Sequence, residues 1–285
     1  MSKIIDGKAV AAIVRGENKA EIASLKEKGL NPKLAVILAG DDPASVIYTR
    51  SIGKACSNAG ALFEQFSFKG AGAEDEVVEV IKRLNIDNSI HGIMIMLPLP
   101  KGMNKQRILE AISPLKDVDG VHPLNRAYNL SNNEGLFPST PQSCIEIMLR
   151  NNISIEGKHA VLVGRGESVG KPLIYMLLNQ NATVTICHTR TRDLVYHTRQ
   201  ADILIAAAGI AKMISAEMVK PGAIVVDVGI NEMADGSICG DVDFENVLPV
   251  AGAITPVPGG VGSLTTALII KNLLKAIKLS KKKHN

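Results

Sequence analysis

The sequence predicts an α/β protein of two domains, and three observations support this prediction. The chain has 285 residues, whereas single domains usually hold about 100–200 residues. Short apolar runs alternate with segments whose apolar residues recur at helical spacing, which is the pattern of parallel strands covered by helices. Hydrophobic residues make up 46% of the chain but aromatic residues only 3%, with no Trp. The core must therefore consist of aliphatic side chains, as in most parallel sheets.

The first half of the chain holds one set of alternating elements. Helical spacing predicts helices over residues 8–28, 43–59, 74–84 and 105–112, and apolar runs predict buried strands over residues 34–40 and 91–97. A stretch rich in Asn, Gly and Pro follows over residues 117–141, and this composition is typical of a connection between domains. We expect a first domain over residues 1–120.

The second half repeats the alternation. It begins with a predicted helix over residues 141–150, and four strands are predicted over residues 160–163, 183–187, 203–207 and 223–227. A last helix over residues 264–279 is expected to pack back on the first domain. We therefore expect a second domain over residues 121–263, with residues 264–285 completing the first domain.

Charge and cysteine content exclude several classes of protein. The net charge is only +4, and its basic excess gathers in residues 278–285 without aromatic neighbours. This end is typical of a solvated helix terminus, so neither a nucleic acid nor a membrane is expected as a partner. The four cysteines are scattered without a CxxC pair, which indicates neither a zinc site nor a disulfide framework. No signal-peptide pattern is present, and we expect a cytoplasmic protein.

A glycine-rich turn is the first chemical signal. Gly164, Gly166 and Gly170 follow the predicted strand 160–163 and precede a helix. Glycines in this context allow backbone N–H groups to approach a phosphate, and the helix N-terminus adds partial positive charge. The spacing is one residue longer than the usual GxGxxG, and such turns also occur without a ligand. The turn, which includes Arg165 and Val169, predicts a Rossmann-type dinucleotide-binding domain. The N-terminal α/β domain would then hold the substrate.

The end of the next strand indicates which dinucleotide is bound. NAD sites usually place Asp or Glu there to hold the ribose 2′-hydroxyl. This chain has instead Thr189, Arg190 and Arg192 after the predicted strand 183–187. Guanidinium groups suit a 2′-phosphate, although a solvated basic turn would have the same composition. We expect NADP rather than NAD.

Two further segments could contact ligands. Residues 254–262 hold three glycines and two prolines, among them Pro258, Gly259 and Gly260, which suits a rigid loop close to a ligand. Asp241 and Asp243 alternate in a way that could suggest a metal site, but no third ligand accompanies them. We expect no metal.

Several segments together resemble one known family. They are Gly40 to Ser45 with Tyr48, residues 97–100, 116–120 and 164–170, residues 227–231, 240–243 and 255–262. This set is similar to that of the methylenetetrahydrofolate dehydrogenase/methenyltetrahydrofolate cyclohydrolase (FolD) family, and the resemblance covers essentially the whole chain. It implies a homodimer in one-carbon metabolism, with folate bound between two lobes.

The resemblance also implies an activity and roles for individual residues. The family oxidises 5,10-methylene-tetrahydrofolate with NADP and then hydrolyses the methenyl product to 10-formyl-tetrahydrofolate. By resemblance, Asp119 binds the pterin and Tyr48 packs against it. The residues implied to hold the cofactor are Gly164, Arg165, Gly166, Val169, Gly170, Thr189, Arg190 and Ile230, with Pro258, Gly259 and Gly260 in the substrate loop.

Two positions depart from the family pattern. The family has Lys four residues after the Tyr, where this chain has Ile52, and Gln directly before the Leu-Pro-Leu-Pro segment, where it has Met96. Lys54 should point to another side of the helix, since it lies about 200° around from Ile52. Hydride transfer needs mainly proximity and orientation, whereas hydrolysis needs an activated water. We therefore expect the dehydrogenase to remain and the cyclohydrolase to be lost or weak.

Two other hypotheses for the function remain. The chain could be fully bifunctional, with its water activated in another way. It could instead be a degenerate paralogue that binds folate or a partner without turnover, or that acts on another substrate.

Overall fold

The computed structural model describes residues 2–282, without the side chain of Ala71, and divides into two compact units. The six-stranded unit comprises Met1–Ala12 and Thr140–Thr265, and the three-stranded unit comprises Ile13–Ser139 and Thr266–Asn285. The chain therefore passes between the units three times. Residues 283–285, which belong to the predicted C-terminal completion of the first domain, lie outside the described residues.

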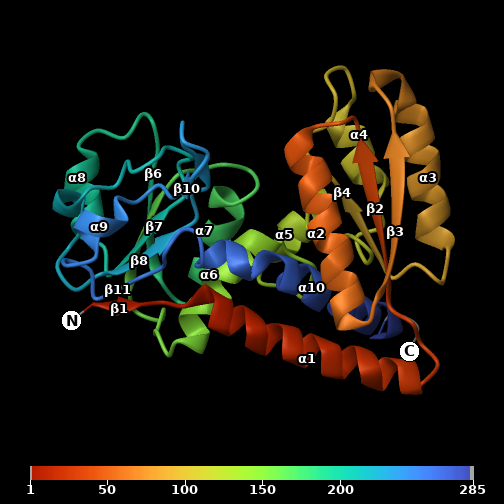
Figure 1. Cartoon of the computed structure of the whole chain (residues 1–285), viewed down its shortest axis with the longest axis horizontal. Coiled ribbons are helices and arrows are strands. Elements are labelled where there is room, and N and C mark those ends of the chain that lie inside the picture. Colours follow the sequence, from red (N-terminus) through yellow and green to blue (C-terminus); the bar gives the residue numbers. More distant parts are fainter. Residues whose placement is uncertain (1, 283–285) are drawn as a thin grey trace. The chain divides into compact units, whose positions relative to one another are not determined.

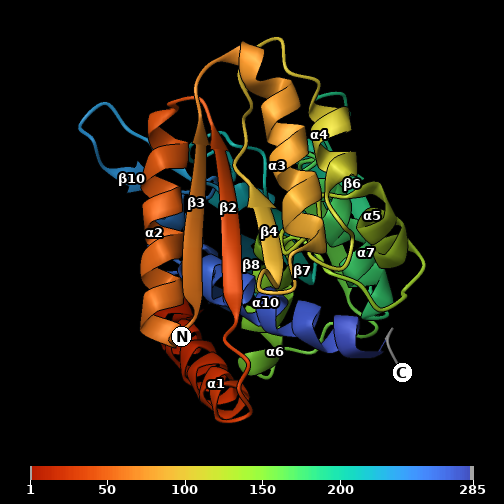
Figure 2. The same ribbon diagram turned by 90° about the vertical axis from the view of Figure 1, so that its right-hand side faces the viewer.

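The three-stranded unit is a parallel sheet with helices on both faces (Figures 1 and 2). Its strands lie in the order β3-β2-β4. They are β2 (Lys33–Ala39), β3 (Leu62–Phe68) and β4 (Gly92–Ile95). Its helices are the greater part of α1 (Gly7–Glu27), α2 (Pro43–Ala59), α3 (Glu74–Ile86), α4 (Lys105–Ala111), α5 (Pro123–Leu130) and α10 (Thr265–Lys282), with a 3-10 turn at Ala71–Ala73.

Alternation along the central strand builds two cores in this unit. Leu34, Val36 and Leu38 of β2 pack with residues of α2 and α10, whereas Ala35 and Ile37 pack with residues of α3 and α4. Successive side chains of a strand point to opposite faces of a sheet. The continuous apolar run that predicted a buried strand therefore supplies both faces of the sheet. The last helix, α10, packs beside β2 in this unit.

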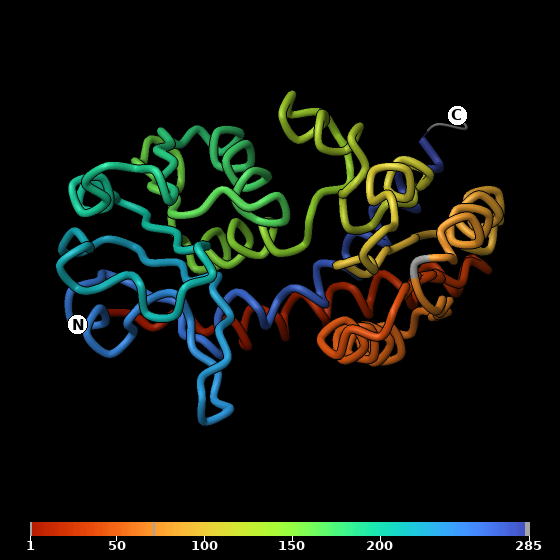
Figure 3. The backbone as a smooth tube through the Cα atoms, turned by 90° about the horizontal axis from the view of Figure 1, so that it is seen from above, coloured from red at the N-terminus to blue at the C-terminus, as the bar shows by residue number. Residues whose placement is uncertain are grey.

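The six-stranded unit is a parallel sheet in the order β1-β11-β8-β7-β5-β6. Its strands are β1 (Lys3–Ile4), β5 (His159–Val163), β6 (Thr183–Cys187), β7 (Ile203–Ala206), β8 (Ile224–Asp227) and β11 (Ala253–Ile254). Its helices are α6 (Ser139–Arg150), α7 (Gly170–Asn179), α8 (Leu194–Thr198) and α9 (Phe244–Val247), with 3-10 turns at Ala216–Met218 and Val261–Ser263. A hairpin of β9 (Asn231–Glu232) and β10 (Ile238–Cys239) extends from this unit (Figure 3).

The strand register aligns the carboxyl ends of this sheet. Val163 pairs with both Cys187 and Ala206, and Ala206 pairs with Asp227. The loops that follow β5, β6, β7 and β8 therefore leave the sheet from one edge. In doubly wound α/β sheets this edge is where ligands bind. The predicted α/β class with a Rossmann-type domain is confirmed.

The structure differs from the predicted connection between the domains. Residues 117–141 are not a simple linker, because they contain α5 and lie in the three-stranded unit up to Ser139. The Nδ2 of buried Asn125 in α5 donates to Pro114 O at 2.9 Å and to Asp117 Oδ2 at 2.8 Å, which anchors the segment. Met1–Ala12, expected in the first domain, is grouped with the six-stranded unit, where β1 pairs with β11.

Within residues 2–282, no helix is long and apolar enough to cross a membrane. Cys56, Cys144, Cys187 and Cys239 are all free, and the first three are buried.

Candidate functional site

The glycine turn after β5 adopts a backbone that only glycine tolerates. Gly164 has φ +125°, and a Cβ there would collide with the carbonyl of Ala207. A Cβ on Gly170 would lie 2.7 Å from Arg165 Cα, so the third glycine lets the start of α7 close against the turn. Around Gly166 nothing lies within 4 Å of such an atom. No side chain caps α7 at Val169. Lys171 N donates instead to Gly166 O at 3.0 Å, which holds the glycine turn against the start of the helix.

The turn after β6 lies next to the glycine turn. Val163 and Cys187 end adjacent paired strands, and Gly164 N donates to Cys187 O at 2.8 Å. The β6 turn is held by His188 N, which donates to Thr191 Oγ1 at 2.8 Å. Thr189 and Arg190 are exposed at its tip. The structure thus brings the predicted phosphate turn and the predicted 2′-phosphate residues to neighbouring strand ends, with no carboxylate at the end of β6.

Two buried carboxylates organise the loops after β7 and β8. Asp241 accepts hydrogen bonds from the backbone N–H groups of Ala208, Gly209 and Ile210 at 2.6–3.0 Å. Asp227 accepts from the N–H groups of three residues at 2.9–3.0 Å, namely Gly229, Asp241 and Val242. Burial is the main reason that the pKa of Asp227 rises to about 6, and the neighbouring Asp241 charge adds to it. These carboxylates shape the loops.

Asp241 and Asp243 could have suggested a metal site from the sequence. Within residues 2–282, no group of three or more His, Cys, Asp or Glu side chains is arranged to hold a metal ion. Sequence reasoning did not reveal the structural role of Asp227 and Asp241, because their backbone partners belong to loops whose positions only the fold defines.

The predicted substrate loop follows β11. Thr255 is buried, and its Oγ1 accepts from Asp227 N at 2.8 Å, which ties the loop to β8. Gly260 is also buried, because Gly7 packs directly on its carbonyl, and Gly259 has φ +112°. Pro258 remains exposed, and so does Ile230, with 69% of its surface accessible. Apolar surface is therefore available at the carboxyl ends of both β8 and β11.

In the three-stranded unit, the start of α2 is fixed to the loop after β4. Asp42 caps the helix by accepting from Ser45 N at 2.9 Å and from Ser45 Oγ at 2.8 Å. The same hydroxyl donates to Leu97 O at 3.4 Å. These contacts couple the helix that carries Tyr48 and Ile52 to the segment that follows Met96.

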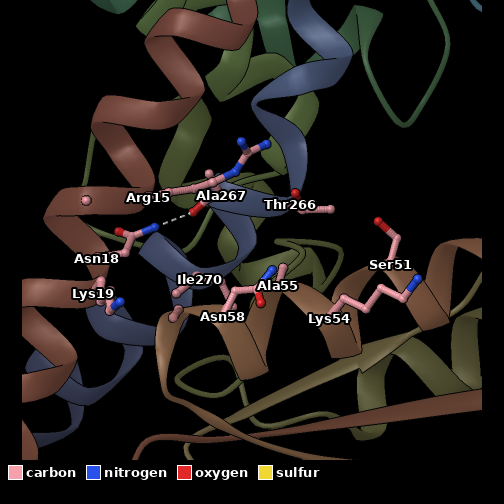
Figure 4. Close-up of a pocket in the computed structure, with 12 residues that line it drawn as sticks. Arg15, Asn18, Lys19, Ser51, Lys54, Ala55, Asn58, Thr266, Ala267 and Ile270 are labelled. Atoms are coloured by element: carbon pink, nitrogen blue, oxygen red, sulfur yellow. Dashed lines mark hydrogen bonds between the residues drawn. The ribbon is translucent and has the colours of Figure 1, made fainter.

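Ile52 and Met96 belong to one apolar cluster. Ile52 is fully buried, Met96 is 3% exposed, and half-buried Tyr48 packs against the same cluster. Lys54 is exposed and lines a cavity with residues of α1 and α10 (Figure 4). The expectation that Lys54 points to another side of α2 therefore agrees with the structure.

Asp119 and Asp117 lie two residues apart in very different surroundings. The backbone of residues 116–118 runs parallel to β4 and pairs with Ile93, with Val118 N donating to Ile93 O at 3.2 Å. Asp117 is fully buried and accepts from Val121 N, His122 N and Asn125 Nδ2. No described residue donates a hydrogen bond to the Asp119 carboxyl. Burial, with a smaller effect of the Asp117 charge, raises the pKa of Asp119 to about 7.

A cavity of about 730 Å³ opens where β2 and β3 end. Two segments quoted for the family resemblance line it, one around Asp41 and Asp42 and the other over residues 98–100. Ser67, Phe68 and Lys69 line it too, and sequence reasoning missed them because β3 was not predicted. The three phenylalanines at positions 63, 66 and 68 were the signal that could have revealed this strand, since aromatic residues are enriched in strands.

Comparison with known proteins gives matches along the whole chain. Residues 5–119 match the family model "Tetrahydrofolate dehydrogenase/cyclohydrolase, catalytic domain", and residues 138–281 match "Tetrahydrofolate dehydrogenase/cyclohydrolase, NAD(P)-binding domain". The chain is 68% identical over 279 residues to a bifunctional protein FolD of Pelotomaculum thermopropionicum, with 98% of each chain covered.

Solved structures give the same result. The bifunctional FolD enzyme of Campylobacter jejuni superposes with a TM-score of 0.96 at 44% identity, covering 98% of this chain and 100% of that one. A Trypanosoma brucei N5,N10-methylenetetrahydrofolate dehydrogenase-cyclohydrolase, complexed with NADP and an inhibitor, has a TM-score of 0.90 at 34% identity and covers 98% of both chains.

Proposed function

The chain belongs to the tetrahydrofolate dehydrogenase/cyclohydrolase family, and from that premise we propose that it oxidises 5,10-methylene-tetrahydrofolate to the 5,10-methenyl form with NADP. The observation that carries this proposal is the edge of the six-stranded sheet, where the glycine turn adjoins a basic turn without a carboxylate. The relative from Trypanosoma brucei, which is complexed with NADP, supports the same cofactor.

The residues at this edge fit NADP. Backbone N–H groups of the glycine turn would hold the diphosphate beside the start of α7, with Gly164, Gly166 and Gly170 allowing close approach. Arg165, Arg190 and Thr189 would hold the 2′-phosphate through charge-assisted hydrogen bonds. Ile230 would contribute apolar contact. When bound, NADP supplies the acceptor for the hydride that leaves the substrate's methylene carbon.

The three-stranded unit would hold the folate. The Asp119 carboxyl receives no hydrogen bond from residues 2–282, so it can accept two from the 2-amino-pyrimidine edge of a pterin. Tyr48 would pack its ring against the pterin face. Neither residue has to transfer a proton for hydride loss, because the lone pair of the folate nitrogen assists that step. Their role is to position the methylene carbon.

We further propose that cyclohydrolase activity is lost or weak. Hydrolysis of the methenyl bridge needs a water from which a proton is removed, and general acid–base groups accelerate such steps by about 10²–10⁴. Ile52 and Met96 have no ionisable group and fill one buried apolar cluster with Tyr48 packed against it. Lys54 faces another cavity and is not a replacement.

Full bifunctionality is the alternative, and one observation favours it. A relative with 68% identity carries the name bifunctional protein FolD. In that case Asp119, whose pKa is raised to about 7, could move a proton near neutral pH.

Two assays on the purified chain separate these possibilities. NADPH formation from 5,10-methylene-tetrahydrofolate is expected, with NAD giving a much lower kcat/KM. The absorbance decay of 5,10-methenyl-tetrahydrofolate is expected to equal the buffer rate, about 10²-fold or more below a general-base-assisted reaction. Absence of NADPH formation would refute the dehydrogenase, and enzyme-dependent decay at a rate similar to NADPH formation would refute the loss of hydrolysis.

The double variant Ile52→Lys/Met96→Gln tests the cause of the loss. Together the new side chains can hydrogen-bond in place of the apolar pair, so methenyl decay should accelerate at least about tenfold over the wild-type chain. Ile47→Lys is the matched control, since Ile47 lies on the same helix but is 66% exposed. Equal decay in the double variant and the control would show that these two positions do not limit hydrolysis.

A further inference from the structure

The loop after β7 directs three successive backbone donors at one carboxylate. Asp241 Oδ2 accepts from Ala208 N at 2.6 Å and from Gly209 N at 2.8 Å. The other oxygen, Oδ1, accepts from Ile210 N at 3.0 Å. Successive N–H groups of this kind form a concave binding place for an anion. Because a side chain already fills it, these donors cannot bind a phosphate of the cofactor.

The loop after β8 holds the same carboxylate. Asn231 Nδ2 donates to Asp241 Oδ1 at 2.9 Å, and a Cβ on Gly229 would collide with that oxygen. The chain passes from there through the β9–β10 hairpin and returns at Asp241, which is fully buried (Figure 3). One side chain therefore sets the loop after β7 against the loop after β8.

The loop after β7 lies in the path of the dinucleotide. In the sheet, β7 lies between β8 and β5, and the register aligns the ends of these strands at Asp227, Ala206 and Val163. The glycine turn follows β5, and Ile230, which the family resemblance implies as a cofactor contact, follows β8. Neighbouring strands lie about 4.8 Å apart. A ligand that touches both the glycine turn and Ile230 must therefore cross the loop between them.

The two halves of NADP meet different loops at this edge. Under the proposed function, the 2′-phosphate and the diphosphate lie at the turns after β6 and β5. The adenosine half therefore ends at the glycine turn. The nicotinamide half is the part that continues toward Ile230, across the loop that Asp241 holds.

We propose that Asp241 is a positioning residue for the nicotinamide half of NADP and acts through the backbone of residues 208–210. The proposal rests on the proposed function, since it assigns part of the same cofactor site. Asp241 binds the three donors within the protein, so the loop keeps one conformation and the phosphate groups are directed to the glycine turn. A loop that is already held in its binding conformation loses less entropy when the ligand binds.

Titration calorimetry with two ligands tests the assignment. One ligand is NADP, and the other is adenosine 2′,5′-bisphosphate, which has the adenosine and the 2′-phosphate but no nicotinamide. In Asp241→Asn one acceptor oxygen replaces two, so the Kd for NADP should rise about tenfold, the value of about one charge-assisted hydrogen bond. The Kd for adenosine 2′,5′-bisphosphate should stay the same, because that ligand ends before the loop after β7.

Asp243→Asn is the matched control. Asp243 lies two residues further on, and its carboxylate accepts from Asn246 Nδ2 at 2.7 Å instead of from the loop after β7. Both ligands should bind this variant as they bind the wild-type chain. In steady-state assays of Asp241→Asn, the KM for NADP should rise by the same factor as the Kd, while the KM for methylene-tetrahydrofolate stays unchanged.

Gly229→Ala reaches the same carboxylate by a second route. This variant retains Asp241 but places a methyl group against its Oδ1, so it should weaken the binding of NADP and not that of adenosine 2′,5′-bisphosphate. If Asp241→Asn does not fold, the comparison of the two ligands in Gly229→Ala decides the question.

Two results overturn the assignment. Equal weakening of both ligands would mean that the substitutions disturb the whole cofactor edge, and unchanged NADP binding would mean that Asp241 does not position the cofactor. The titrations contain no folate, so they do not depend on turnover. A wild-type chain that binds NADP but forms no NADPH would refute the dehydrogenase alone, which keeps failure of the proposed function distinguishable from failure of this assignment.

Discussion

Asp117 and Asp119 are only two residues apart in the sequence, but their carboxyl groups have different roles. Asp117 receives donors from two backbone N–H groups and from Asn125, so its hydrogen-bonding capacity is used to hold α5. Asp119 receives none from the described residues. Burial raises its pKa to about 7, so its charge changes within the physiological range. A group of this kind in a ligand site makes binding depend on pH.

The first prediction at the residue scale is a pH dependence of folate binding. Below about pH 7 Asp119 becomes protonated and can accept fewer hydrogen bonds from the pterin edge. The KM for methylene-tetrahydrofolate should therefore rise about tenfold between pH 8 and pH 6, the value of about one charge-assisted hydrogen bond. Steady-state assays at saturating NADP measure it. Asp119→Asn should have a high KM at both pH 6 and pH 8. If KM rises equally from pH 8 to pH 6 in the wild-type chain and in the variant, the assignment is wrong.

The same carboxyl affects stability with a defined sign. Its pKa is about 7 in the folded chain and 3.8 without the fold, so between these values the native state binds a proton that the unfolded state has released. The free energy of unfolding therefore falls as pH rises through this window. Asp119→Asn should flatten that decline in urea titrations at pH 5 and pH 8.

At the scale of elements, the turn between β5 and α7 combines two glycines with different tasks. Gly164 has φ +125° and no room for a Cβ, whereas Gly166 has space around it. Gly164→Ala should lower the free energy of unfolding by about 1–3 kcal/mol, the cost of a strained backbone position. Gly166→Ala should leave stability nearly unchanged and raise the KM for NADP only. Urea unfolding of both variants measures the difference, and equal loss of stability would be evidence against this division.

The sequence predicted those elements best whose ends carry chemical signals. Both ends of α2 agree with the structure, because Pro43 begins it and Gly60 ends it in a left-handed conformation. In contrast, β3 was missed, since residues 62–68 mix polar and apolar side chains on an edge strand. The helix α5 was missed because its Asn residues suggest a loop. Asn125 and Asn129 are buried in it, and only tertiary partners make that favourable.

Only those parts of the candidate site that depend on neighbouring residues in the sequence could be predicted. Glycine spacing and the absence of a carboxylate after β6 were visible in the sequence, because they depend on neighbours along the chain. The support that Asp227 and Asp241 give to the loops was not visible, because each carboxylate binds backbone groups from distant segments.

At the scale of the whole molecule, one amide joins distant parts of the three-stranded unit. The Nδ2 of Asn272 in α10 donates to Val118 O and to Phe137 O, both at 2.7 Å. These partners lie 154 and 135 residues away in the sequence. The contacts hold the C-terminal helix against the segment that carries Asp119.

Replacing this amide should therefore weaken both stability and substrate binding. Asn272→Ala leaves one buried and one part-buried carbonyl without their donor, and the free energy of unfolding should fall by about 1–3 kcal/mol. The KM for folate should rise at the same time, since Asp119 follows Val118 directly. Lys281→Ala, in the exposed last turn of the same helix, is the control. Urea unfolding and steady-state kinetics measure both effects, and a variant as stable as the control would refute the role of Asn272.

The threefold passage of the chain between units has a consequence during synthesis. A ribosome releases β2, β4 and α2 long before it has made Ile269, Ile270 and Leu273, which cover the same apolar cluster in the finished unit. At about 5–20 residues per second, the nascent chain leaves this surface uncovered for many seconds. Cellular holdases that bind apolar segments would therefore meet the three-stranded unit before its own last helix does.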